Sequence, residues 1–131
     1  MAGFTDYLED ALLKHVFTNT SYTSPSAVYA ALYTVAPSDT GGGTEVSTSG
    51  TAYARQAMAF SVSGTGTLAT NSAAVEYPTA TADYGTVVAV GIFDASSSGN
   101  LLAYASLTAN KTVSSGDVFR FNAGDVDITL T

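Results

Sequence analysis

Residues that could perform acid–base chemistry are few in this 131-residue sequence. His15 is its only histidine, and it lies inside a helical pattern next to Val16. A catalytic histidine needs a nearby nucleophile and an orienting group. The sequence has no Gly-x-Ser-x-Gly motif that would present a serine in that position. We therefore interpret His15 as a structural residue.

The acidic side chains are the next candidates. Asp125 and Asp127 could supply two oxygen ligands to Ca²⁺. The apolar residues that alternate with them, Val126, Ile128 and Leu130, indicate instead a strand whose acidic face points outward. Such a charged face discourages strands from pairing edge to edge. Two carboxylates at a set separation could also hydrolyse glycosides, and the acidic residues considered for this reaction lie close to turn-forming residues: Glu45, Glu76, Asp83 and Asp94.

Glycine and tyrosine give no stronger sign of a ligand site. The run Gly41-Gly42-Gly43 lacks the Lys and Ser/Thr that follow in a phosphate-binding loop. Tyrosines can stack on sugars, but in a small β-protein they more commonly fill the core or subunit contacts, and we favour that role here: Tyr22, Tyr29, Tyr33, Tyr53, Tyr77, Tyr84 and Tyr104. We predict that the chain is not an enzyme and that it binds neither a metal ion nor a cofactor.

Composition narrows the range of partners. Ala, Thr, Ser and Gly make up about half of the chain, and only 11% of the residues are charged. Four basic residues against eleven acidic ones give a net charge of −7, which argues against nucleic acid as a partner. The absence of cysteine excludes disulfides. The N-terminus does not resemble a signal peptide, and no apolar stretch has the length of a transmembrane helix, so we expect no membrane partner.

Hydrophobic periodicity predicts one helix followed by strands. Apolar residues recur every three or four positions over residues 4–17, and Thr5 or Asp6 can cap this helix. After Pro25, apolar runs at roughly ten-residue intervals alternate with turn residues, as in an antiparallel sandwich. Thr86–Phe93 is apolar on both faces and is expected to be a buried central strand. The other predicted strands are Ala27–Val35, Tyr53–Val62, Ala73–Tyr77, Leu101–Thr108, Lys111–Val113, Val118–Asn122 and Asp125–Leu130.

These elements predict a mainly β fold, an antiparallel β-sandwich or jelly-roll-like domain with one N-terminal α-helix. No linker divides the chain, so we expect one domain over residues 1–131, in which residues 1–20 form the helix and its lead-in. The segment Tyr77–Thr86 contains a proline and lacks apolar alternation. We expect it to be a long connection that crosses the surface.

Three blocks of sequence resemble a known family. The first comprises AVYAALYTVAP at 27–37, GGGTEV at 41–46 and YARQA at 53–57; the second spans 71–86, with NSAA and YPTATADYGT; the third has GIFDA at 91–95 and GNLLA at 99–103. Together they resemble a family of small structural proteins of tailed bacteriophages, usually labelled tail fibre proteins. The pattern is also similar to capsid decoration, or cement, proteins, which sit as trimers on the phage head.

The resemblance implies a non-enzymatic virion protein made in the host cytoplasm. Our first hypothesis is a capsid decoration protein that forms a homotrimer and stabilises the head shell through contacts with the major capsid protein. The alternative is a tail fibre or tail-surface subunit that binds a tail protein and touches the host. A carbohydrate-binding module or a glycan-cleaving enzyme is a third hypothesis, from a different class.

Two parts of the chain are candidates for contact with a partner. One is the N-terminal helix, and the other is the region around Arg55, whose side chain is expected on the strand face opposite Met58 and Phe60. There it would be available for a polar contact. The candidate contact residues are Phe4, Leu8, Leu12, Tyr53, Arg55 and Tyr84.

Overall fold

Two layers of antiparallel strands form the body of the protein, described here from a computed structural model that covers residues 3–62, 64 and 66–129. The strands of the larger layer are β1 (Gly3–Phe4), β2 (Tyr29–Val35), β3 (Thr44–Glu45), β4 (Gln56–Ala57), β8 (Gly85–Phe93) and β9 (Leu101–Val113). They follow the order β1-β9-β8-β2-β3, and β4 also pairs with β2. The long strands β2, β8 and β9 are thus neighbours in the middle of this layer.

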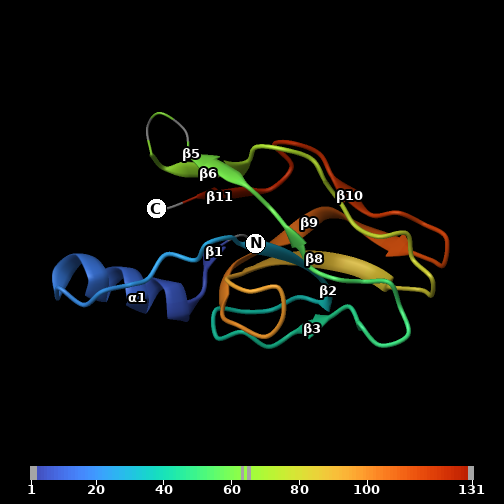
Figure 1. Ribbon diagram of the computed structural model, residues 1–131, viewed down its shortest axis with the longest axis horizontal. Helices are drawn as coiled ribbons and strands as arrows, with labels where there is room; N and C mark the ends of the chain where they lie inside the picture. Colours follow the sequence, from blue (N-terminus) through green and yellow to red (C-terminus); the bar gives the residue numbers. More distant parts are fainter. Residues whose placement is uncertain (1–2, 63, 65, 130–131) are drawn as a thin grey trace.

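A second layer of shorter strands covers one face of the first (Figure 1). Its strands are β5 (Phe60–Val62), β6 (Leu68–Asn71), β7 (Val75–Glu76), β10 (Arg120–Phe121) and β11 (Asp127–Thr129). They form a three-stranded sheet, β11-β6-β5, and a two-stranded sheet, β10-β7. Helix α1 (Asp6–Phe17) projects from one end of the two layers (Figure 1). The predicted mainly β sandwich with an N-terminal helix is confirmed.

The middle of the larger layer is buried on both faces. In β2, Ala30 and Leu32 face the core between the layers, whereas Ala31 and Tyr33 belong to a second cluster on the opposite face. All four are at most 4% exposed. Strand β8 lies between β2 and β9 and is buried from residue 89 to residue 93. The predicted buried central strand is confirmed, because only residues that are apolar on both faces fit this position.

Two buried polar side chains stabilise the second layer. The Tyr77 hydroxyl, in a residue 1% exposed, donates a hydrogen bond of 2.7 Å to the carbonyl of Ala30 in the larger layer. Asn71 is equally buried; its amide nitrogen donates to the Asn122 carbonyl at 2.9 Å, and its oxygen accepts the Val126 N–H at 2.8 Å. A buried polar group is tolerated only when it is hydrogen-bonded in this way.

Several predicted boundaries are wrong. The two strands expected at 101–108 and 111–113 are one strand, β9, whose register with β8 shifts between Val87 and Ala89. The single strand expected at 53–62 is instead β4 and β5, which belong to different layers. Strands β1, β3 and β6 were not predicted. The predicted inward position of Leu130 lies outside the described residues.

The connection at 77–86 also differs from the prediction. Three of its residues, Tyr77, Ala80 and Tyr84, are at most 4% exposed and belong to the main core. The segment therefore contributes to the core and does not simply cross the surface. The sequence does not predict this role. Core residues that are spaced irregularly, as in this segment with its proline, give no periodic pattern that could be recognised.

Candidate interaction surface

Helix α1 is fixed to the sandwich at its first turn. Thr5 is the N-cap: its hydroxyl oxygen accepts the Leu8 N–H at 3.5 Å, one of the amides that a helix leaves unpaired at its start. The same hydroxyl donates to the Leu101 carbonyl at 2.6 Å, and the Thr5 N–H donates to the Leu102 carbonyl at 2.9 Å. Thr5 is 2% exposed. Through these hydrogen bonds it both begins the helix and anchors it to β9.

The far end of α1 is closed by local hydrogen bonds. The Thr18 hydroxyl donates to the Lys14 carbonyl at 2.7 Å, which satisfies a carbonyl of the last turn. Nδ1 of His15 accepts the backbone N–H of Tyr22 at 3.2 Å, so this histidine attaches the returning chain to the helix. Asn19 takes a positive φ of 57° where the chain reverses.

The two sides of α1 have different surroundings. Leu8, Ala11 and Leu12 are half-buried on the inner side. At the start of the outer side are Asp6 and Glu9, which are exposed. Their negative charges are stabilised by the positive end of the helix dipole. No helix residue is fully buried.

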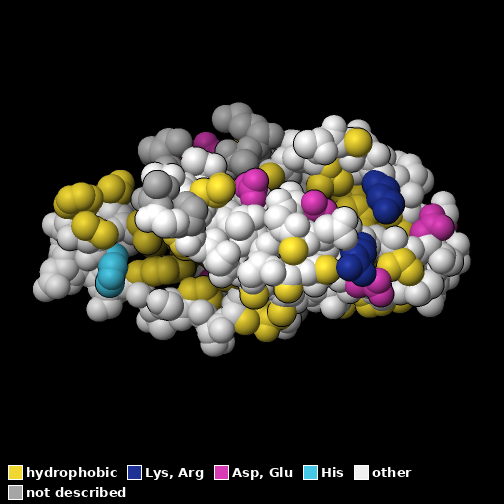
Figure 2. Space-filling model, turned by 90° about the horizontal axis from the view of Figure 1, so that it is seen from above, with side chains coloured by type: hydrophobic (Ala, Val, Ile, Leu, Met, Phe, Trp, Pro, Cys, Tyr) yellow, Lys and Arg dark blue, Asp and Glu magenta, His cyan; other side chains and the backbone are white. Residues whose placement is uncertain are grey.

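The last two turns of α1 carry an exposed apolar stripe, which we call the apolar tip. It consists of Leu13, Val16 and Phe17, which are 60%, 64% and 77% exposed. Their spacing of three and four residues places them on one side of the helix. Figure 2 shows hydrophobic side chains gathered on this projecting end of the molecule. Large apolar side chains grouped at a projecting end are characteristic of an interaction surface.

An apolar groove lies at the base of the same helix. It has a volume of about 370 Å³ and runs between the start of the chain, the second layer and β9. We define this apolar groove by six of its side chains, Phe4, Leu8, Val28, Phe60, Leu68 and Ile128. Val62 of β5 also lines it and is 65% exposed.

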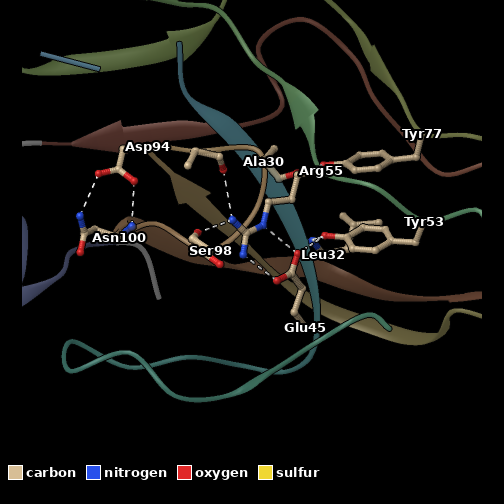
Figure 3. A network of polar contacts seen from close by, with 10 residues as sticks. Ala30, Leu32, Glu45, Tyr53, Arg55, Tyr77, Asp94, Ser98 and Asn100 are labelled. Carbon is tan, nitrogen blue, oxygen red and sulfur yellow. Dashed lines mark hydrogen bonds and ion pairs between the residues drawn. The ribbon is translucent and has the colours of Figure 1, made fainter. Parts of the chain in front are cut away.

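At the end of the larger layer, Arg55 and Glu45 form an ion pair inside the chain (Figure 3). Nη2 and Nε of Arg55 each donate to the Glu45 carboxylate at 2.9 Å, and Nη1 donates to the carbonyls of Ala95 and Ser98 at 3.1 and 2.8 Å. The Arg55 side chain is 9% exposed. Its guanidinium lies 3.6 Å from the centre of the Phe93 ring, a cation–π contact.

Tyr53 completes this network. Its hydroxyl donates to the Glu45 carboxylate at 2.6 Å and accepts the Leu32 N–H at 3.0 Å. Burial and the hydrogen bond to Glu45 raise the pKa of the Tyr53 phenol, and the Leu32 N–H offsets part of this effect. Glu45 thus receives three hydrogen bonds from side chains, and the phenol stays protonated. This arrangement suits a structural link better than proton transfer.

The six predicted contact residues separate into two groups. Phe4 and Leu8 line the apolar groove, and Leu12 is half-buried on the helix that leads from it. Tyr53 and Tyr84, 3% and 4% exposed, are in the core instead. These two tyrosines and Arg55 form the second group, and their side chains already make hydrogen bonds within the chain. Contact with a partner stays a prediction for all six.

The carboxylates considered for glycoside hydrolysis also have structural partners. Asp94 accepts two hydrogen bonds from Asn100, at 2.8 and 3.0 Å, and Asp83 accepts the Ser115 N–H at 2.8 Å. Glu76 lies 3.5 Å from Arg120 on the surface. Within residues 3–62, 64 and 66–129, no group of three or more His, Cys, Asp or Glu side chains could hold a metal ion.

The sequence prediction missed the apolar tip. The predicted periodicity over residues 4–17 describes a single apolar face, and Val16 falls on it together with Leu8 and Leu12. The signal was present, because Leu13, Val16 and Phe17 follow the spacing of a second stripe. Only the structure shows that this stripe remains uncovered within the chain.

Comparison with protein families gives a match over residues 3–129, to the family described as podophage GP4 fiber I protein gp80. The chain belongs to this family. It is therefore a phage virion structural protein of the fibre type, as the sequence resemblance implied. A search of curated proteins finds no match.

The fibre family membership agrees with the character of the site. Glu45, Asp83 and Asp94 bind other parts of the chain, as do both arginines. The apolar tip and groove are suited to contact with another protein surface. No helix of the described chain is long and apolar enough to cross a membrane.

Proposed function

We propose that the chain is a subunit of a phage fibre, carried on the tail and working by binding alone. The observation that supports this most strongly is the family match over residues 3–129, whose description names a fibre protein. Capsid decoration, our first hypothesis from the sequence, has no comparable support. The tail location of the alternative hypothesis fits the family description better.

In this proposal the sandwich is a rigid module held by side-chain contacts with its neighbours. The partners are a tail protein of the same virion and further copies of the chain, for which we propose a homotrimer. Many modest contacts between repeated subunits add up, because each one raises the effective concentration for the next. The projecting helix and the apolar groove are the surfaces offered for such contacts.

Gold labelling of intact phage particles tests the location. An antibody raised against the purified chain, coupled to gold and imaged by electron microscopy, should label the tail or its fibres. The control is the same antibody after absorption with the purified chain, which should leave particles unlabelled. Gold spread evenly over the head would contradict the fibre proposal and restore capsid decoration. Particles without specific label would contradict both virion locations.

A further inference from the structure

The chain carries two exposed apolar surfaces, one that projects and one that is hollow. The apolar tip projects, with Phe17 77% exposed, and the apolar groove is a hollow of about 370 Å³. A volume of this size is at the lower end of that of a ligand pocket and can hold a few side chains. Removing both surfaces from water is favourable in proportion to the apolar area covered.

The tip of one chain cannot reach its own groove. Leu8 lines the groove, and Phe17 follows it nine residues later on the same straight helix. At 1.5 Å per residue the two are about 13 Å apart along the helix axis. Because Thr5 fixes the base of the helix to β9, the helix cannot turn back into the groove without losing that anchor.

Charge argues against the simplest alternative, two helices packed side by side in opposite directions. Asp6 and Glu9 share the outer side of α1 with the apolar tip. An antiparallel pair would place these carboxylates of one copy against the tip of the other, and burying unpaired charge is costly. Insertion of the tip alone leaves the acidic turns in water.

We propose that the apolar tip of one copy inserts into the apolar groove of a second copy of this chain. Such a contact is head-to-tail, so each copy gives one tip and receives another, and the series closes into a ring if the rotation allows it. A closed ring covers both surfaces of every copy, so that neither the tip nor the groove is left in contact with water. The proposal does not depend on where the chain sits in the virion.

The molar mass of the full chain in solution, measured by light scattering after size exclusion, tests this contact. The wild type should form an oligomer. Phe17→Glu removes the tip and Val62→Glu disrupts the groove, and both should be monomers. Both positions are at least 65% exposed, so the fold should tolerate the change. The matched control is Val35→Glu, at a residue 56% exposed that does not line the groove, and it should remain oligomeric.

Mixing the two monomeric variants gives the sharpest result. The intact tip of the Val62→Glu chain should enter the intact groove of the Phe17→Glu chain, and the product should be a dimer that grows no further. A wild type that is monomeric at high concentration would overturn the proposal. So would a Val62→Glu variant that stays oligomeric, which would indicate contact between tips, or a mixture that stays monomeric.

Crosslinking provides a second measurement that does not need a charged substitution. The natural chain has no cysteine, so Phe17→Cys and Val62→Cys introduced together provide the only thiols. Mild oxidation should join copies through Cys–Cys bonds between tip and groove, seen as a ladder on a non-reducing gel. A single monomer band would overturn the proposal.

Discussion

The Glu45–Arg55 ion pair links segments that are distant in sequence. Through it, β3 is joined to the chain before β4 and, by the carbonyls of Ala95 and Ser98, to the turn after β8. Removing two charges from water is costly, and the pair is favourable only when its remaining polar atoms are also satisfied. Here Tyr53 and the two carbonyls provide those additional hydrogen bonds.

We expect Arg55→Ala to destabilise the fold. The substitution leaves a partly buried Glu45 carboxylate without its cation and uncovers the Phe93 ring, so the free energy of unfolding should fall by about 2–4 kcal/mol. Urea denaturation followed by circular dichroism measures this. Arg120→Ala is the matched control, since the Arg120–Glu76 pair is more than half exposed and should contribute at most about 0.5 kcal/mol. Equal urea midpoints for the two variants would contradict the structural role of Arg55.

Among the elements, helix α1 is attached to the sandwich by hydrogen bonds at its first turn. Thr5 caps the helix and donates to β9, while none of the helix residues is fully buried. A short helix in water is only marginally stable without tertiary support. The Asp6 N–H adds a hydrogen bond of 2.9 Å to the Asp39 carbonyl. The orientation of the helix, and with it of the apolar tip, therefore depends on hydrogen bonds at its base, in which Thr5 has the largest share.

Thr5→Ala should loosen the helix and leave the sandwich intact. Loss of the cap and of the buried hydroxyl contact costs about 1–2 kcal/mol. Hydrogen exchange should become faster for the amides of residues 6–17 and stay slow for those of β8. Thr5→Ser keeps the hydroxyl and serves as the control, with near wild-type protection. Unchanged exchange of the helix amides in Thr5→Ala would show that other contacts hold the helix.

How far the sequence predicted these elements depended on their length and periodicity. Helix α1 and strand β8 are predicted correctly because each has a long apolar pattern, whereas β9, whose polar second half interrupts that pattern, is predicted as two strands. The break between β4 and β5 was missed, since Met58 and Phe60 continue the alternation although the chain changes layer there. Arg55 was expected to be free because its partners, Glu45 and Ser98, are ten and forty-three residues away. The alternation of apolar and polar residues predicts the strand face on which a side chain lies, but it does not predict which distant residues contact that side chain.

For the whole molecule, the aromatic core links both layers. Tyr53, Tyr77 and Tyr84 pack ring against ring, and Tyr77 also contacts Phe119 and Phe121 of the second layer. On the other face of the larger layer, Tyr33 stacks on Phe93 beneath Arg55. Phenol groups buried on both faces make the stability of the entire sandwich sensitive to alkaline pH.

Stability should be constant through neutral pH and fall above about pH 10. Burial, and next the nearby Glu45, raise the pKa of Tyr33 to about 12, while Arg55 acts in the opposite direction. Burial likewise raises the pKa of Tyr53 and Tyr77. Unfolded tyrosine ionises near pH 10, so above that pH the unfolded chain releases protons that the folded chain retains. By linkage, the free energy of unfolding then decreases as pH rises, by about 1.4 kcal/mol per pH unit for each such tyrosine.

Urea denaturation from about pH 9 to about pH 12 measures this slope. Phenolate absorbance at high pH should rise for the buried tyrosines only as the chain unfolds. Tyr33→Phe removes one of the retained protons, so its stability should decline less steeply over the window between pH 10 and about 12. A slope equal to that of the wild type would mean that Tyr33 ionises within the folded chain. The stacking of its ring on Phe93 would then not keep the phenol from water.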